Sequence, residues 1–177
     1  MHANSNPPQS SKFSVQQTTT APTGFINSLK VTSTSAYTVG SGDIFLISQF
    51  IEGLNVADLG WGTANAKTIT LSFQVYSSLT GTFGGALGNS AANRSYPFTY
   101  TISSANTWTT ISVTIAGETS GTWSTTNSTG IAVYLGLGVG TTYSGTAGSW
   151  QAGNTGFVSG SQSIVGTSGA TFYITGV

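Results

Sequence analysis

Four carboxylates are the acidic side chains with which this chain could do acid–base chemistry: Asp43, Glu52, Asp58 and Glu118. Glu52 precedes a short segment of helical character at residues 54–59, Asp58 lies near its end, and the two could approach each other. A glycoside hydrolase needs two carboxyl groups about 5.5 Å or about 6.5–9.5 Å apart in a sugar-binding cleft, and no pattern in the sequence indicates such a cleft. We therefore expect Glu52 to accept backbone N–H groups of the turn that follows it. Asp58 is expected to cap a turn or to pair with Lys67 or Arg94, so the sequence predicts no enzyme.

Nucleophilic and metal chemistry lack their usual residues. The chain has no cysteine and one histidine, His2, which lies in a polar N-terminal segment, so neither a Ser-His-Asp triad nor a zinc site can be assembled. Calcium takes about six to eight oxygen ligands, some of which Asp43, Glu52 or Asp58 could supply together with asparagine side chains. No Asp-rich calcium loop supports a structural calcium ion, however, and we expect neither a metal nor another cofactor.

Aromatic side chains in loops are the remaining residues that could bind a ligand. A sugar stacks its apolar C–H face on an aromatic ring while polar side chains pair with its hydroxyl groups. Trp123 and Trp150 lie in stretches rich in glycine, serine and threonine, which favours exposure, and Trp61 between two glycines could form a lid over one end of the fold. Trp108 begins an alternating segment, and we assign it to the core. Although large aromatic residues more often fill a core than hold a ligand, the predicted carbohydrate-binding residues are Trp123, Trp150, Tyr143 and Trp61.

The chain is long enough for one domain and nearly free of charge. It has 177 residues and a mass of 18.0 kDa; 5% of its residues are charged, and the net charge is zero. Four cations spread over this length cannot form the basic surface that nucleic acid requires. No apolar run reaches the ~20 residues of a membrane span, and the N-terminal residues lack the apolar core of a secretory signal. We expect no nucleic-acid partner and no membrane insertion.

Alternating apolar and polar residues predict β-strands along most of the chain. Residues 68–76 alternate apolar side chains with threonine, serine and glutamine, and residues 44–47 form a continuous apolar run typical of a strand covered on both faces. The period of two recurs in residues 96–102, 111–115, 131–137 and 172–174. Glycine- and serine-rich turns separate these segments, and helical character is confined to residues 54–59. The pattern indicates an all-β fold, an antiparallel two-sheet β-sandwich whose long connections favour jelly-roll topology.

Residues 1–24 form a segment of different composition. Pro7 and Pro8 favour extended backbone, and Phe13 and Val15 alternate with polar neighbours, as in a short strand that lies on another surface. A segment this polar is either a flexible tail or an arm ordered by its own sandwich or by another chain. We predict an extended N-terminal arm at residues 1–24, with Pro7, Pro8, Phe13 and Val15 as its assembly contacts, before a sandwich at residues 25–177.

Several blocks of the sequence carry a resemblance to a known family. They are QFIEGLNVADLGWGTANAKTITLSFQVYSSLTGTFGGAL from Gln49, then NRSYPFTYTI, ANTWTTISVTIAGETSGTW, NSTGIAVYLGLGVG and ATFYITGV. From about residue 13 to residue 177 the chain resembles the jelly-roll module of tailed-bacteriophage virion surface proteins of the capsid-decoration and tail-fibre type, which is similar in architecture to carbohydrate-binding modules. The resemblance implies a β-sandwich on a phage particle. Such modules usually continue past the last strand, and the end of this sequence at Gly176 and Val177 favours a free-standing virion protein.

Two functions follow from the residues and the resemblance together. The first is a non-enzymatic virion structural protein, a capsid decoration or cement protein, which assembles as a homo-oligomer, for example a trimer, with phage capsid or tail proteins as partners. Near-zero net charge suits the close packing of many copies, and the arm would latch onto a neighbouring subunit. The alternative is a carbohydrate-binding receptor-recognition module of a tail fibre or capsid fibre, with host-surface glycans as ligands. Both functions imply the exterior surface of the virion, after synthesis in the host cytoplasm.

The geometry of the aromatic rings would separate these two functions. Two or more exposed and roughly coplanar rings beside asparagine, Arg94 or a carboxylate would favour sugar binding. Burial of residues 1–24 against another chain would favour cementing.

Overall fold

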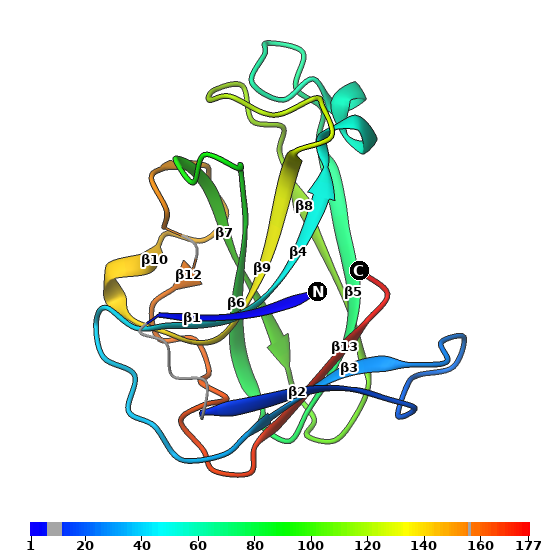
Figure 1. Ribbon diagram of the computed structural model, residues 1–177, viewed down its shortest axis with the longest axis vertical. Helices are drawn as coiled ribbons and strands as arrows, with labels where there is room; N and C mark the ends of the chain where they lie inside the picture. Colours follow the sequence, from blue (N-terminus) through cyan, green and yellow to red (C-terminus); the bar gives the residue numbers. More distant parts are fainter. Residues whose placement is uncertain (7–11, 156) are drawn as a thin grey trace.

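Two antiparallel sheets packed face to face make up the fold in the computed structural model, which describes residues 1–6, 12–155 and 157–177 (Figure 1). The six-stranded sheet has the order β1 (His2–Asn6), β4 (Ile44–Glu52), β9 (Thr129–Val139), β6 (Gly81–Gly88), β7 (Arg94–Ile102) and β11 (Gln151–Ala152). The five-stranded sheet has the order β2 (Phe13–Thr18), β3 (Ser28–Ser33), β13 (Thr171–Thr175), β5 (Ile69–Ser77) and β8 (Thr109–Ile115). A short parallel pair joins β10 (Ser144–Gly145) to β12 (Phe157–Val158).

The strand pairs are nested within one another. β3 pairs with β13, β4 with β9, β5 with β8 and β6 with β7, all antiparallel. Successive pairs alternate between the five-stranded and the six-stranded sheet. This is the wiring of a jelly roll, in which an eight-stranded double ribbon is wrapped into two sheets. The fold class predicted from alternation, an antiparallel β-sandwich with jelly-roll topology, is confirmed.

Alternate side chains along the strands point into the space between the two sheets and form the core. In β5, Phe73 and Val75 are buried while Thr70 and Ser72 are exposed, as the alternation predicts. In β4, four consecutive residues from Phe45 to Ser48 are buried, which agrees with a strand covered on both faces. The core between the sheets is rich in aromatic rings, among them Phe45, Phe73, Phe83, Phe98, Tyr100 and Phe172.

The predicted helical segment consists of two short 3-10 turns, η1 (Gly53–Asn55) and η2 (Ala57–Leu59), at one end of the sandwich. Glu52 precedes η1 without a side-chain capping bond, so the role predicted for it is wrong. The reason is that main-chain carbonyl groups of the loop before β9 already accept from the Gly53 and Leu54 N–H groups. No helix in the described part of the chain has the length and apolar character needed to cross a membrane.

The N-terminal segment contributes an edge strand to each sheet. β1 pairs with β4 and β2 pairs with β3, so the segment covers the edges of both sheets on one side of the sandwich. Phe13 packs edge-on against Phe45 with ring centroids 6.3 Å apart, whereas Val15 is 37% exposed. Pro7 and Pro8 lie outside the described residues. Within a single chain the surface that orders the segment is its own sandwich, and contact of the arm with another chain stays a prediction.

A buried ion pair joins the loop between β8 and β9 to β7. Arg94 donates from Nε, at 3.0 Å, and from its terminal nitrogen to one carboxylate oxygen of Glu118, and the other oxygen accepts the Ser120 N–H at 2.8 Å. The Glu118 side chain is 4% exposed and that of Arg94 20%. Asp58 pairs with Lys67, one of the two partners predicted for it. In contrast to the buried pair, both side chains are mostly exposed, and Lys67 Nζ lies 3.8 Å from Asp58 Oδ2. Only the buried pair is expected to matter for stability.

One tyrosine hydroxyl in the aromatic core has no partner. Tyr100 is 5% exposed and contacts the rings of Phe73 and Phe83 at centroid distances of 5.3 and 5.7 Å. Among the described residues, none accepts from or donates to its hydroxyl. Burial raises the pKa of this phenol far above its usual value, so the group is neutral in the folded protein.

Arg94→Met should lower the free energy of unfolding by about 3 kcal/mol, because it leaves the Glu118 carboxylate buried without its partner. Urea denaturation followed by tryptophan fluorescence measures this change. The double variant Arg94→Met/Glu118→Leu should recover much of the loss, and Lys67→Met, the matched control at the exposed pair, should cost less than about 0.5 kcal/mol. A loss at Arg94 no greater than that at Lys67 would contradict the role assigned to the buried pair.

Tyr100→Phe should raise the free energy of unfolding by about 1 kcal/mol, because it removes a buried hydroxyl that forms no hydrogen bond. The same denaturation experiment at neutral pH measures the gain. Tyr143→Phe, at a half-buried position outside the core, serves as the control and should leave stability unchanged. A destabilised Tyr100→Phe variant would mean that the hydroxyl has a partner in solution.

The stability of the wild-type protein should fall as the pH rises above about 10, and Tyr100→Phe should reduce the slope. The pKa of Tyr100 is raised in the folded state, so the unfolded chain loses this proton first and is favoured at alkaline pH. The contribution of one such group is about 1.4 kcal/mol per pH unit above the unfolded pKa. Parallel slopes for the two proteins between pH 10 and 11 would contradict the assignment.

Candidate functional site

Three of the predicted carbohydrate-binding residues meet at one end of the sandwich. Trp61 follows η2, Trp123 lies in the loop between β8 and β9, and Trp150 lies immediately before β11. Their ring centroids are 4.8, 5.3 and 5.4 Å apart and their planes cross at 82°, 79° and 81°. We call this group the tryptophan cluster. Its rings pack edge to face, which is a favourable aromatic geometry, and they do not form a coplanar platform.

Each indole N–H of the cluster donates to a main-chain carbonyl oxygen, within its own loop for Trp61 and Trp123 and in the loop between β8 and β9 for Trp150. The bonds run from Trp61 to Lys67 (2.8 Å), from Trp123 to Ser120 (3.0 Å) and from Trp150 to Ala116 (2.7 Å). Trp61 is 7% exposed and belongs to the core, and the other two rings are half-buried against it. The cluster thus ties three loops together at this end.

The backbone conformation next to Trp61 explains why a glycine lies on each side of it. Gly60 ends η2 with φ of +62°, and Gly62 has φ of +84°, a conformation that side chains disfavour. A Cβ atom on Gly62 would also lie 2.7 Å from the carbonyl oxygen of Gly121 and 3.1 Å from the Trp123 ring. These glycines let the chain turn sharply enough to place Trp61 beneath the neighbouring loop.

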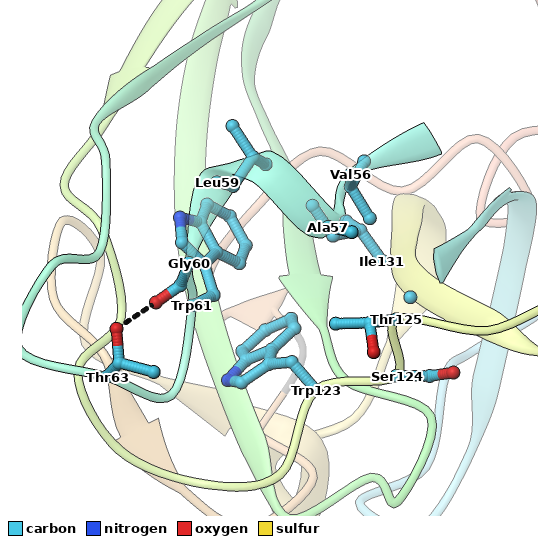
Figure 2. Close-up of a pocket in the computed structure, with 11 residues that line it drawn as sticks. Val56, Ala57, Leu59, Gly60, Trp61, Thr63, Trp123, Ser124, Thr125 and Ile131 are labelled. Carbon is cyan, nitrogen blue, oxygen red and sulfur yellow. Dashed lines mark hydrogen bonds between the residues drawn. The ribbon is translucent and has the colours of Figure 1, made fainter. Parts of the chain in front are cut away.

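A pocket of about 180 Å³ opens beside the tryptophan cluster. Figure 2 shows Trp61 and Trp123 along one part of its wall, and Val56, Ala57 and Ile131 along another. The remaining lining residues are Leu59, Gly60, Thr63, Ser124, Thr125 and Gly130. The walls are therefore apolar and aromatic, and hydroxyl groups lie among them.

The hydroxyl groups of the pocket are held in place by local hydrogen bonds. Thr63 Oγ1 donates to the Gly60 carbonyl at 2.6 Å, as Figure 2 shows. The hydroxyl of Ser124 lies 2.6 Å from that of Ser128 and 3.1 Å from that of Thr126. Each hydroxyl oxygen can accept or share a further bond, so the lining offers a ligand fixed polar positions.

The lining has no residue that could act as an acid or a base. None of the described residues around the pocket is an acid, a base, a histidine or a tyrosine. The Arg94–Glu118 pair that supports the adjoining loop is buried and mutually neutralised. No group of three or more acidic, histidine or cysteine side chains gathers among the described residues to hold a metal ion. The arrangement is suited to binding an uncharged molecule.

Two aromatic residues do not lie where the sequence analysis placed them. Tyr143, the fourth predicted binding residue, lies in η3 (Thr141–Tyr143) and belongs neither to the tryptophan cluster nor to the pocket lining. Trp108, assigned to the core, is half-buried and contacts Tyr76 and Tyr173 on the outer face of the five-stranded sheet. The reason is parity: Trp108 is three residues before the buried Ile111, and an odd separation along a strand places side chains on opposite faces.

Several residues of the pocket and one exposed aromatic residue were not predicted from the sequence. The pocket residues Val56, Ala57 and Ile131 carry no motif, and only the closure of the end of the sandwich brings them together. Phe50 in β4, which the sequence analysis did not single out, is 43% exposed and contacts Tyr134 edge-on at 6.5 Å. Phe50 lies two residues after the buried Ser48 and therefore on the same face of β4, so its exposure could not be predicted from strand alternation.

No protein-family description and no curated protein matches the sequence. Solved structures to which it is similar include a family 4 carbohydrate-binding module, with 15% identity and a TM-score of 0.45 over 94% of this chain and 92% of that one. A C-terminal family 22 carbohydrate-binding module of Clostridium thermocellum Xyn10B shows 12% identity and a TM-score of 0.44 over 97% and 81%. A family 11 module from Clostridium thermocellum, in complex with a β-1,3-1,4-mixed-linked tetrasaccharide, shows 12% identity and a TM-score of 0.47 over 98% and 84%. These likenesses are ones of fold.

Proposed function

We propose that this chain is a non-catalytic β-sandwich module that binds carbohydrate, with one sugar ring in the pocket beside Trp61 and Trp123. The observation that carries the proposal is the composition of the lining, which joins two indole rings and aliphatic side chains to hydroxyl groups and holds no titratable group. A pyranose ring has the matching chemistry, since its C–H faces are apolar and its edge carries hydroxyl groups. Such a pocket gives affinity through the apolar walls and orientation through the polar positions.

The size and charge of the pocket narrow the ligand. Its volume of about 180 Å³ lies below the ~300 Å³ at which pockets for drug-sized molecules begin, so a single ring suits it better than a chain of rings. A charged group would be costly here, because the lining offers no opposite charge to offset its loss of water. The favoured ligand is therefore one neutral sugar ring, either free or at the end of a glycan.

The biological setting of this activity rests on the resemblance to phage virion surface modules. In that setting the module lies on the exterior of a phage virion, as a decoration protein or as part of a fibre, and the pocket meets glycans of the host surface. Assembly with further copies of the chain, as a trimer or another oligomer, and with capsid or tail proteins belongs to the same proposal. The scarcity of charge, 5% of residues, supports close packing of copies.

Ala57→Phe should abolish sugar binding, because Ala57 is exposed at the pocket wall and a phenyl ring there would fill the cavity without disturbing the tryptophan cluster. Wild-type protein titrated with glucose, galactose, mannose and N-acetylglucosamine should give a saturable change in tryptophan fluorescence with at least one of them. The affinity for that sugar should fall at least tenfold in the variant.

Ala105→Phe provides the matched control, since Ala105 is exposed in the loop before β8 at the opposite end of the sandwich. This control should bind the sugar as the wild type does. Unaltered affinity in Ala57→Phe, or no saturable response to any of the four sugars, would overturn the proposal.

A further inference from the structure

The outer face of the five-stranded sheet carries a row of side chains that crosses four strands and ends at the residue before the fifth, β8. In the register of the sheet, Gln16 lies opposite Lys30, Lys30 opposite Tyr173, and Tyr173 opposite Tyr76. Trp108 precedes Thr109, which lies opposite Val75, so Trp108 continues the row beside Tyr76. We call these five residues the aromatic row. With strands about 4.8 Å apart, the row is about 19 Å long.

Three rings form a compact group within this row. Their centroids are 5.0 Å apart for Tyr76 and Tyr173, 5.6 Å for Tyr76 and Trp108, and 6.3 Å for Trp108 and Tyr173. The Lys30 ammonium lies 5.6 Å from the centroid of the Tyr173 ring. All four side chains are half-buried, so part of each ring faces solvent.

The surroundings of the rings are hydroxyl-rich. The exposed residues on the same face of β5 and β8 are Thr70, Ser72, Thr110, Ser112 and Thr114. Cross-strand aromatic pairs stabilise a sheet by about 0.2–1 kcal/mol, and the Tyr76–Tyr173 pair serves that purpose. Trp108 lies outside the strand and adds a third half-buried ring, which pairing within the sheet does not require.

Charge on this face is of one sign. The five strands of the sheet contain one charged residue, Lys30, and no acidic residue. The two cations that pair with carboxylates, Lys67 and Arg94, lie at the pocket end of the molecule. Among the described residues Lys30 forms no ion pair, so a carboxylate of a ligand would complement its charge.

We propose that the aromatic row is a second binding surface and that its ligand is a segment of an acidic polysaccharide. The planes of Trp108, Tyr76 and Tyr173 cross at 49°, 78° and 70° and form no coplanar platform, so a sugar ring packs against one ring of the group while a carboxylate of the chain pairs with the Lys30 ammonium. The row from Gln16 to Trp108 is about 19 Å long, which fits a chain of sugars rather than a single ring. This surface is independent of the pocket, because Trp108 and the pocket lie at opposite ends of β8, about 20 Å apart at ~3.4 Å per residue.

Native-gel electrophoresis through polygalacturonate, alginate or hyaluronate tests the proposal. At least one of these acidic polysaccharides should slow the wild-type protein, and fully methyl-esterified pectin, which lacks the carboxylate charge, should slow it much less. Lys30→Gln and Trp108→Ala should each weaken the retardation at least fivefold, and added salt should weaken it for the wild type. Thermal denaturation establishes that both variants are folded.

Two control variants distinguish binding at this surface from a general effect of charge and from binding in the pocket. Lys67→Gln removes the same charge at a distant site and should be retarded almost as the wild type is. Ala57→Phe, the pocket variant, should be retarded fully, so the two proposals can fail separately. Equal losses in Lys30→Gln and Lys67→Gln, equal retardation by esterified pectin, or no retardation by any acidic polysaccharide would overturn the proposal. A wild-type dimer that Trp108→Ala converts to a monomer in sedimentation would also overturn it and would assign the face to self-association.

Discussion

The hydrogen bonds from three indole N–H groups to loop carbonyls are the interaction on which the candidate site depends. The loops that carry Trp123 and Trp150 are rich in glycine, serine and threonine and have little apolar surface of their own. Trp61, Trp123 and Trp150 supply that surface, and each also satisfies a main-chain carbonyl that would otherwise need water. The Arg94–Glu118 pair holds the loop between β8 and β9, which carries Trp123, to β7. The pocket wall therefore exists before any ligand arrives, and little ordering is needed on binding.

The few charges in the chain mostly have partners within it. Asp43 accepts from the Tyr37 hydroxyl at 2.8 Å and from the Gly40 N–H at 2.7 Å, which fixes the turn before β4. Lys12 and Lys30 form no ion pair among the described residues, and their ammonium groups lie 5.0 Å from the centre of the Tyr37 ring and 5.6 Å from that of Tyr173. Recognition by the rest of the surface must then use rings and hydroxyl groups, whose interactions depend little on salt. A salt-dependent contribution is expected only where an unmatched charge such as that of Lys30 lies beside rings.

Strand parity explains both what could be predicted from the sequence and what was missed. The alternation in β5 places Phe73 and Val75 in the core, and the same rule places Tyr76 on the outer face. Trp108 could have been assigned to that face by counting back from Ile111, but its size favoured a core assignment. The meeting of Trp61, Trp123 and Trp150 could not be predicted, because no local pattern links residues from three loops. It follows from the pairing of β4 with β9, β5 with β8 and β11 with β7, which brings those loops to one end.

The separation of the two surfaces along β8 affects how they would act together. Each surface is small. The pocket holds one sugar ring and the aromatic row contains three aromatic rings, so each alone would bind with modest affinity. A single branched or folded polysaccharide that reaches both ends of one sandwich gains from the second contact without any new interaction, because the first contact raises its local concentration. The gain grows when several copies of the chain lie side by side. Low charge makes that packing easier, since neighbouring copies repel one another little. The same composition that leaves few groups for catalysis thus favours weak binding at many points.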